Sequence, residues 1–297
     1  MTVLITGATG FVGINVFKWM QDNTDFELLG CGRKLIKNNN YVKCDLTNLK
    51  KLDAIFKQYD ISAIIHIAAQ LSDFSCARQK YENIVMAQNI KYCMRKYSTK
   101  TIINISSIPI IGNISYVPID ELHPIKPSTA YHQAKWEIEK LFTQLTYGSI
   151  KVYNVRIPSP LGPGLPQDSF FNVVLNNALQ NKRINIFASP GVKQNFVDIR
   201  DLCNLLKEIL YYKPPAGTYL FGSEKAISYY DAALLVRKYL NSSSEIKINK
   251  QTDRSDNKLV QWDIDISKVN RKIGITPRYT LMQTIDWILQ SETSDSF

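Results

Sequence analysis

The sequence has few of the features that mark membrane, metal-binding or disulfide-stabilised proteins. Its 297 residues contain no apolar run of about 18 residues, the length with which a helix crosses a bilayer. Three histidines and five cysteines are scattered along it, without a C-x-x-C pair or the ligand spacing of a zinc site. We therefore expect no membrane association, no metal, and unpaired thiols of the kind found in a reducing compartment.

The sequence also lacks a secretory leader. Met1 is followed almost at once by the apolar run Val3-Leu4-Ile5, without a basic segment or a cleavage site, so we expect a cytoplasmic protein. The net charge is +10, but the 36 Lys and Arg are spread along the chain among 26 acidic residues. This distribution favours a solvated lysine-rich surface, or attraction to small polyanions, over a nucleic-acid interface.

Apolar runs rich in β-branched residues alternate with segments of helical spacing. The runs cover residues 2–6, 26–31, 41–44, 62–68, 101–105 and 150–155, and the helical segments cover 11–21, 49–59, 76–97 and 131–147. Strands buried on both faces and separated by helices predict an α/β fold with a Rossmann-type, doubly wound parallel sheet. Sheets of this kind bind ligands beyond the carboxyl ends of their strands.

The first apolar run ends in a G-x-x-G-x-x-G motif at residues 7–13. Glycines at this spacing let the chain turn tightly and bring backbone N–H groups up to a pyrophosphate at the start of a helix. A glycine triplet often arises by chance, but this one lies between the first strand and the first helix, where the mechanism requires it. The motif predicts a dinucleotide site whose contacts are Gly7, Thr9, Gly10, Phe11, Val12 and Gly13.

The residues that follow the second and third runs bear on the choice of dinucleotide. NAD sites usually place an acidic residue after the second strand, whereas an Arg accommodates the 2′-phosphate of NADP. Arg33 and Lys34 stand there, which favours NADP(H), with NAD as the alternative and solvated surface charges as the other interpretation. After the third run, Asp45-Leu46 offers a carboxylate to the adenine amino group, although Asp45 is also a candidate cap for the next helix.

A second motif, Y-x-x-x-K, opens the last predicted helix of this half. Tyr131 and Lys135 share one helix face, so the ammonium can sit beside the phenol. Together with an adjacent nicotinamide cation, it would lower the pKa of the phenol toward the working range. Ser107 ends a predicted strand 24 residues earlier and can donate to the same substrate oxygen. Each feature alone is common in cores and turns, but together they predict a catalytic set of Ser107, Tyr131 and Lys135.

Beyond residue 156 the pattern loosens into a loop rich in Pro and Gly and then into shorter elements. We therefore predict an NAD(P)-binding domain over residues 1–156, to which segments at about 192–212 and 255–268 return. Residues 157–297 are expected to form mainly a smaller, substrate-binding lobe.

With these motifs in place, the chain resembles the extended short-chain dehydrogenase/reductases, in their nucleotide-sugar epimerase/dehydratase group, over nearly its whole length. Besides the glycine turn, the resemblance rests on His66-Ile67-Ala68-Ala69-Gln70, Asn83-Ile84-Val85, Ile105-Ser106-Ser107, Arg156 to Gly164, Phe196 to Leu202 and Gly274 to Pro277. It aligns Ser107, rather than Ser106, with the catalytic serine. It further implies cofactor contacts at Ala68, Ala69, Gln70, Asn83, Tyr131, Lys135 and Pro158, and substrate contacts at Ser107, Tyr131, Ser159 and Arg254.

The chain departs from the family pattern at several positions. Ser159 stands where Asn is usual, and Gln194-Asn195 replaces an Arg-Asp pair, which puts a basic contact to the substrate nucleotide in doubt. Ile108-Pro109 stands where 4,6-dehydratases carry an Asp-Glu pair, so elimination chemistry is not expected.

The resemblance and the basic residues after the second strand favour an NADPH-dependent reductase of a nucleotide-linked 4-keto-6-deoxy sugar. Tyr131 would donate the proton, and related enzymes supply polysaccharide biosynthesis. A nucleotide-sugar 4-epimerase with tightly bound NAD is the alternative, and a non-catalytic NADP-binding protein is the third possibility. The resemblance also implies a nucleotide-diphosphate sugar as substrate and a homodimer that pairs through residues 76–97 and 131–147.

Overall fold

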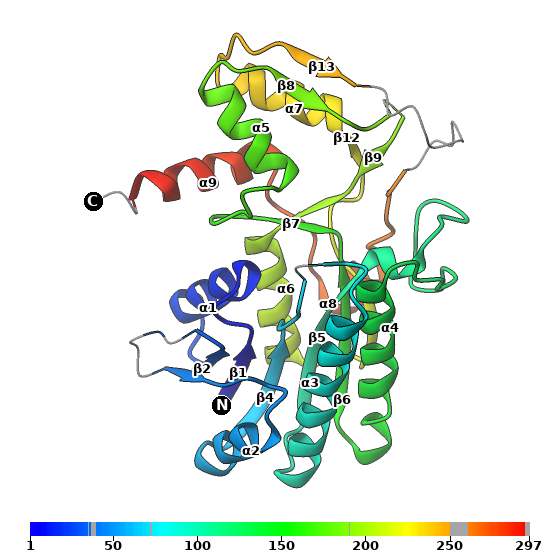
Figure 1. Ribbon diagram of the computed structural model, residues 1–297. Helices are drawn as coiled ribbons and strands as arrows, with labels where there is room; N and C mark the ends of the chain where they lie inside the picture. The colour runs from blue at the N-terminus through cyan, green and yellow to red at the C-terminus, as the bar shows by residue number, and fades with distance from the viewer. Residues whose placement is uncertain (35, 37–39, 72, 190, 250–260, 295–297) are drawn as a thin grey trace.

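The computed structural model describes residues 1–34, 36, 40–71, 73–189, 191–249 and 261–294 (Figure 1). Its centre is a seven-stranded sheet in the order β11-β6-β5-β4-β1-β2-β3. Every neighbouring pair is parallel. The strands are β1 (Thr2–Thr6), β2 (Glu27–Gly32), β3 (Tyr41–Lys43), β4 (Ile61–His66), β5 (Thr101–Ser107), β6 (Lys151–Ile157) and β11 (Gly217–Leu220).

Side chains alternate along the strands between two apolar cores, one on each face of the sheet. Val3 and Ile5 face the core formed with α1 (Phe11–Asn23), α6 (Ile199–Tyr212) and α8 (Ser267–Ile273). Leu4 faces the other core, which is formed with α2 (Leu49–Gln58), α3 (Ala77–Lys96) and α4 (Ala130–Thr143). Helices thus cover both faces, as parallel strands require. The predicted doubly wound parallel sheet is confirmed.

Two elements differ from the predicted pattern. The helix expected to reach residue 147 ends at Thr143, and a separate 3-10 turn, η2 (Thr146–Gly148), follows it. Strand β11, which pairs with β6 at the edge of the sheet, was not predicted. All five cysteines are free thiols. Within the described ranges, no helix is both long enough and apolar enough to cross a membrane.

The smaller elements of the C-terminal half gather beyond the carboxyl ends of the sheet strands, where Figure 1 shows α5 (Phe170–Leu179) and α7 (Tyr229–Tyr239) at the top. With α9 (Leu281–Ser294) they enclose a third core. Three short strand pairs accompany them: β7 (Ser159–Leu161) with β10 (Phe196–Asp198), β8 (Ile184–Ile186) with β13 (Ile246–Ile248), and β9 (Lys193–Gln194) with β12 (Ile227–Ser228).

Arg200, at the start of α6, connects the last segment of the chain to the sheet domain. Its guanidinium pairs with Asp198 at 2.7 Å. It also stacks on two rings, with centroids 3.7 Å away in Tyr279 and 4.5 Å away in Trp287. The Thr284 hydroxyl donates to the same aspartate at 2.7 Å. These contacts dock α9 against α6 with a partly buried charge that is paired and hydrogen-bonded.

Candidate active site

The glycine turn has two positions where a side chain cannot fit and one where it can. A Cβ at Gly13 would lie 2.0 Å from the carbonyl oxygen of Gly7, and Gly7 itself has φ +72 and lies against Ala68. At Gly10, by contrast, the nearest atom would be the Gly7 oxygen at 3.4 Å. Gly10 is also the N-cap residue of α1, and in the described structure no side chain caps that helix. The space beside Gly10 therefore suits an anion at the positive end of α1.

Thr9 connects this turn to the end of β2. A Cβ at Gly32 would come within 2.5 Å of its hydroxyl oxygen, so the glycine in β2 permits this close approach. Phe11 and Val12 are half-buried against the core between the sheet, α1 and α6. The predicted pyrophosphate contacts thus form one compact turn, and their assignment to a cofactor stays a prediction.

Arg33 and Lys34 directly follow β2 and are exposed. Asp45, just beyond β3, accepts hydrogen bonds from the Thr47 backbone N–H at 2.9 Å and from its hydroxyl at 2.8 Å. These bonds, together with the nearby charge of Arg33, lower the pKa of Asp45. Arg33 and Asp45 therefore lie close together at the carboxyl ends of β2 and β3, and the adjoining Leu46 is buried.

The interpretation of Asp45 as a helix cap is wrong. Asn48 is the N-cap of α2, and its side chain accepts from the Lys51 backbone N–H at 3.1 Å. Asp45 instead closes a local turn with Thr47, which leaves it at the strand end.

The loop after β4 carries the predicted contacts Ala68, Ala69 and Gln70, which are half-buried. Asn83, buried on α3, uses its amide on both backbone groups of Gln70: Oδ1 accepts from N–H at 2.7 Å, and Nδ2 donates to the carbonyl at 3.1 Å. In the polypeptide Asn83 therefore positions the loop that faces the glycine turn. A direct contact from Asn83 to a cofactor stays a prediction.

The start of α4 is fixed from two sides. Thr129 caps the helix by accepting from the His132 backbone N–H at 3.2 Å. The Tyr131 N–H donates to the Phe74 carbonyl at 3.0 Å, and the Phe74 ring meets the Tyr131 ring edge-on with centroids 5.3 Å apart. The loop after β4 thus holds the half-buried Tyr131 in place at the carboxyl edge of the sheet.

Lys135 lies deeper, beneath the end of β5. Its ammonium donates to the Ile105 carbonyl at 2.8 Å and lies 5.8 Å from the centroid of the Tyr131 ring. Ser107 ends the same strand two residues later and is half-buried, whereas Ser106 is buried on the α4 side of the sheet. Helix α4 packs against both β5 and the 3-10 turn η1 (Ile108–Ile111) that follows it. The structure thus brings together the elements that carry Ser107, Tyr131 and Lys135.

The electrostatics of this group differ from the sequence-based expectation. We expected Lys135 and a nicotinamide cation together to lower the pKa of Tyr131; in the polypeptide alone, burial of the phenol raises it. Burial also lowers the pKa of Lys135, to about 8, while the Glu139 carboxylate opposes that shift. Burial disfavours each charged form, and it is the cause of the raised pKa of Tyr131. Tyr131 is therefore a neutral phenol at neutral pH.

A narrow cavity adjoins the end of β5 on the side of the C-terminal lobe. It is lined by Ile108, Pro109, Pro158, Ser159, Gln194, Asn195, Trp262 and Ile264. Two predicted site residues, Pro158 and Ser159, therefore lie in its wall. The sequence reasoning missed Trp262 and Ile264, which come from a late segment of the chain. Arg254 lies outside the described residues.

Asn195 ties this late segment to the cavity. Its amide nitrogen donates to the carbonyls of Ser223 and Trp262, and its side chain is buried. In the parts of the chain that the structure describes, no cluster of His, Cys, Asp or Glu has the arrangement of a metal site.

Comparison with known proteins adds the family. A family model described as the NAD dependent epimerase/dehydratase family matches residues 3–220. The UDP-glucose 4-epimerase of Halalkalibacterium halodurans is 23% identical, over 96% of this chain and 93% of that protein. The crystal structure of a Thermotoga maritima UDP-glucose 4-epimerase with UDP-glucose has a TM-score of 0.89 at 18% identity, over 99% of both chains. RMD of Pseudomonas aeruginosa in complex with NADPH has a TM-score of 0.83 at 20% identity, over 99% of both chains. At these identities the two structures show a common fold.

The different surroundings of Gly10 and Gly13 lead to a testable contrast. Gly10→Val should leave the fold intact but abolish dinucleotide binding, because its side chain would fill the space beside the start of α1. Gly13→Val should instead destabilise the protein, because its Cβ overlaps the Gly7 carbonyl. Calorimetric titration with NADP(H) and thermal unfolding separate the two effects. A folded Gly10→Val protein with unchanged affinity would mean that the pyrophosphate lies elsewhere.

Proposed function

The chain belongs to the NAD dependent epimerase/dehydratase family, and we propose that within this family it is an NADPH-dependent reductase of a nucleotide-linked 4-keto-6-deoxy sugar. The observation that carries the proposal is the exposed Arg33 at the end of β2, beside Asp45 and next to Lys34. A cation at this position can pair with a 2′-phosphate, whereas NAD sites commonly use an acidic residue there. Reductases consume NADPH and exchange it at every turnover, and the exposed cation of Arg33 supports this choice of cofactor.

The polypeptide fits a dinucleotide at the proposed place. The room beside Gly10 and the start of α1 would receive the pyrophosphate, and Arg33 would receive the ribose phosphate. The loop of Ala68, Ala69 and Gln70 would lie along the cofactor, toward Tyr131. Bound NADPH supplies the hydride for reduction of the ketone. The complex of the Pseudomonas aeruginosa protein with NADPH supports this choice by analogy.

The catalytic side chains then have separate tasks. Tyr131 donates its proton to the carbonyl oxygen as negative charge develops there, and Ser107 donates a hydrogen bond to the same oxygen. Lys135, anchored on the Ile105 carbonyl, stabilises the phenolate that remains. Because burial raises the pKa of Tyr131, the protonated donor is the resting form at neutral pH, as a reductase requires.

The sugar of the substrate is proposed to lie beside η1 and the C-terminal lobe, where the cavity of about 20 Å³ would have to widen to receive it. Under this proposal residues 1–156, with later returning segments, bind the cofactor, and residues 157–297 bind mainly the sugar nucleotide. Ser159 lies in the cavity wall, next to the neutral Gln194 and Asn195. Part of the returning segment 255–268 and the proposed diphosphate ligand Arg254 lie outside the described residues.

A nucleotide-sugar 4-epimerase is the second candidate, and the relatives that bear this name favour it. It would use Ser107, Tyr131 and Lys135 with a tightly held NAD that is reduced and then reoxidised. Denaturing the purified protein distinguishes the two, because an epimerase releases about one NAD per chain and a reductase releases little. A protein that only binds NADP(H) is the third candidate, against which the intact catalytic set argues.

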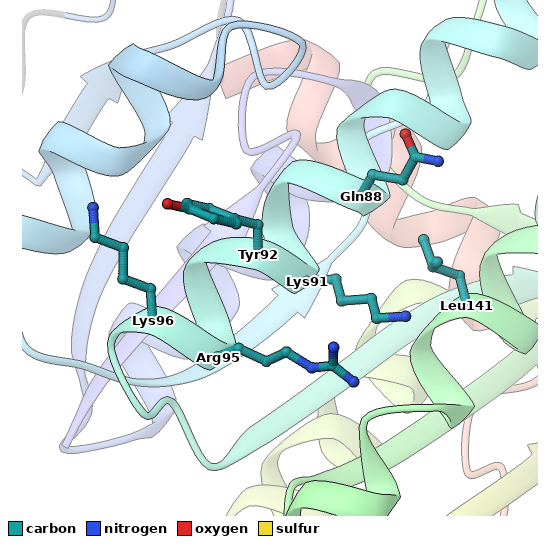
Figure 2. A pocket seen from close by; sticks show the side chains of 6 residues that line it. All are labelled: Gln88, Lys91, Tyr92, Arg95, Lys96 and Leu141. Atoms are coloured by element: carbon teal, nitrogen blue, oxygen red, sulfur yellow. The ribbon is translucent and has the colours of Figure 1, made fainter.

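We further propose a homodimer that pairs through α3 and α4. Their outer face carries a groove lined by Gln88, Lys91, Tyr92, Arg95, Lys96 and Leu141, and Figure 2 shows these side chains along the two helices. Tyr92 is half exposed, which suits burial in an interface. Burial, and to a smaller extent the charge of Arg95, lowers the pKa of Lys91. Because the groove carries Lys91, Arg95 and Lys96, pairing brings like charges together, and salt should strengthen it by screening them. Sedimentation at two salt concentrations tests the arrangement.

Arg33→Asp should weaken NADPH binding by roughly 10- to 100-fold while changing NADH binding little, because it replaces a charge-assisted hydrogen bond with repulsion. Lys18→Asp, an equal charge change on the exposed side of α1, is the control. Titration of both cofactors into all three proteins provides the comparison. Equal losses for NADPH and NADH would show that Arg33 does not contact the 2′-phosphate.

Tyr131→Phe keeps the ring but removes the proton donor. Single-turnover hydride transfer should fall by about 100- to 10,000-fold with NADPH affinity retained. Ser107→Ala should cost less, because it removes one hydrogen bond to the developing charge. A Tyr131→Phe protein that reduces the substrate at the wild-type rate would exclude Tyr131 as the donor and favour the binding-only candidate.

A further inference from the structure

Helix α4 buries two charged side chains one turn apart, on the face that packs against the sheet. Lys135 is 4% exposed and Glu139 is 2% exposed. A buried charge is strongly destabilising unless another charge or hydrogen bonds compensate it. The contacts of these two residues therefore explain how the protein keeps a cation beside Tyr131.

Glu139 pairs with a residue of the sheet rather than with Lys135. Arg156 on β6 donates from Nε to Oε1 at 3.0 Å and from Nη2 to Oε2 at 2.8 Å, and it is itself 4% exposed. Among the contacts of the described residues, no ion pair joins Glu139 to Lys135, whose ammonium donates to the Ile105 carbonyl instead. The planar fork of an arginine fixes a carboxylate in one orientation.

Glu139 nevertheless acts on Lys135 across one helical turn. Its carboxylate raises the pKa of Lys135 against the effect of burial. The other titratable groups nearby carry no negative charge at neutral pH, and Tyr131 is a neutral phenol there. Burial and the Lys135 charge lower the pKa of His66 on β4 to about 3 and that of His132 to about 4, so both imidazoles are neutral. Within the described structure, Glu139 is therefore the anion that compensates Lys135.

Arg156 fixes the direction of the Glu139 carboxylate through hydrogen bonds from Nε and Nη2. A carboxylate without its guanidinium partner could turn toward Lys135 and draw the ammonium away from the Ile105 carbonyl. That movement would also displace the ammonium from the Tyr131 ring, whose centroid now lies 5.8 Å away. The ion pair with Arg156 keeps the Glu139 carboxylate one helical turn from the Lys135 ammonium without direct contact between the two.

We propose that the Glu139–Arg156 ion pair is a positioning element of the active site, which keeps Lys135 charged and directed at Tyr131. Neither residue of the pair is expected to touch the substrate. The consequence for catalysis rests on the proposed function, in which Tyr131 gives up its proton beside the Lys135 ammonium. The pair then sets the alkaline limit of that proton transfer.

Glu139→Gln tests the proposal because it removes the charge and keeps the shape. An ammonium that loses its anionic neighbour deprotonates more easily, so the titration midpoint of Lys135 should fall from about 8 by roughly one unit or more. NMR of isotope-labelled lysine reports this midpoint without any sugar substrate, and Lys135→Met assigns the resonance. Glu137→Gln is the matched control, since Glu137 lies on the outer side of the same helix and pairs with Lys80 at 3.0 Å.

The same proteins are then compared in single-turnover hydride transfer across pH. The alkaline limb of the profile should move to lower pH together with the Lys135 midpoint, whereas Glu137→Gln should change neither. A folded Glu139→Gln protein with an unchanged Lys135 midpoint overturns the proposal, and so does a shifted midpoint with an unchanged pH profile. A wild type that titrates as expected but reduces no keto sugar overturns the proposed function alone.

Glu139→Gln leaves Arg156 buried without its anion, so a second variant guards against failure to fold. Glu139→Leu/Arg156→Met removes both charges at similar volume, a replacement that is often neutral or stabilising for buried ion pairs. The Lys135 midpoint should fall in this protein as well, but by less than in Glu139→Gln, because the Arg156 cation is lost together with the Glu139 anion. An unchanged midpoint in the double variant contradicts the proposal equally.

Discussion

Seven parallel strands can be buried only where helices cover both faces of the sheet, and this requirement organises the whole chain. Each return of the chain through a helix sends the next strand in the same direction, so all carboxyl ends meet at one edge. The glycine turn, Arg33, Ser107 and the loop that holds Tyr131 all follow strand ends or precede helix starts. Residues far apart in the sequence become neighbours there, and the C-terminal lobe adds the wall that faces them.

The same arrangement places polar groups inside the sheet at one location. Most of the face toward α2, α3 and α4 is aliphatic. At the ends of β4, β5 and β6, however, it carries His66, Asn104 and Arg156, and Asn104 donates to Asn154 at 2.9 Å. Lys135 enters this polar region from α4. The buried Lys135 ammonium beside Tyr131 therefore lies among polar side chains that can stabilise a charge. Glu139 is the anion in this region that compensates it.

Much of this could be predicted from the sequence because the signals are local. The glycine turn, the strand and helix periods and the spacing of Tyr131 and Lys135 all lie within single elements or their junctions. Strand β11 was not predicted because it lies beyond residue 156, where strands and helices no longer alternate regularly in the sequence. The cap of α2 could not be decided between Asp45 and Asn48, because both are good capping residues and only the exact helix start separates them.

Properties that depend on tertiary packing could not be predicted in this way. The direction of the pKa shift of Tyr131 follows from burial, which the motif does not reveal. A β-bridge between Ile119 and Ile264 brings Trp262 and Ile264 to the cavity. The two bridged residues lie far apart in the sequence, so no local pattern indicates their contact. Glu139, by contrast, stands four residues after Lys135, so its place on the catalytic face was open to prediction, although its partner Arg156 was not.

Under the proposed function the protein transfers hydride from NADPH to a keto sugar, and deuterium labelling of the cofactor tests this transfer directly. The protein is incubated with a panel of 4-keto-6-deoxy nucleotide sugars and with NADPH that carries deuterium at the transferred position. Mass spectrometry then measures the deuterium content of the sugar products. We predict one deuterium in the sugar for each NADPH oxidised. Interconversion of nucleotide sugars without deuterium uptake or NADPH consumption would contradict the claim and assign the protein to the epimerases.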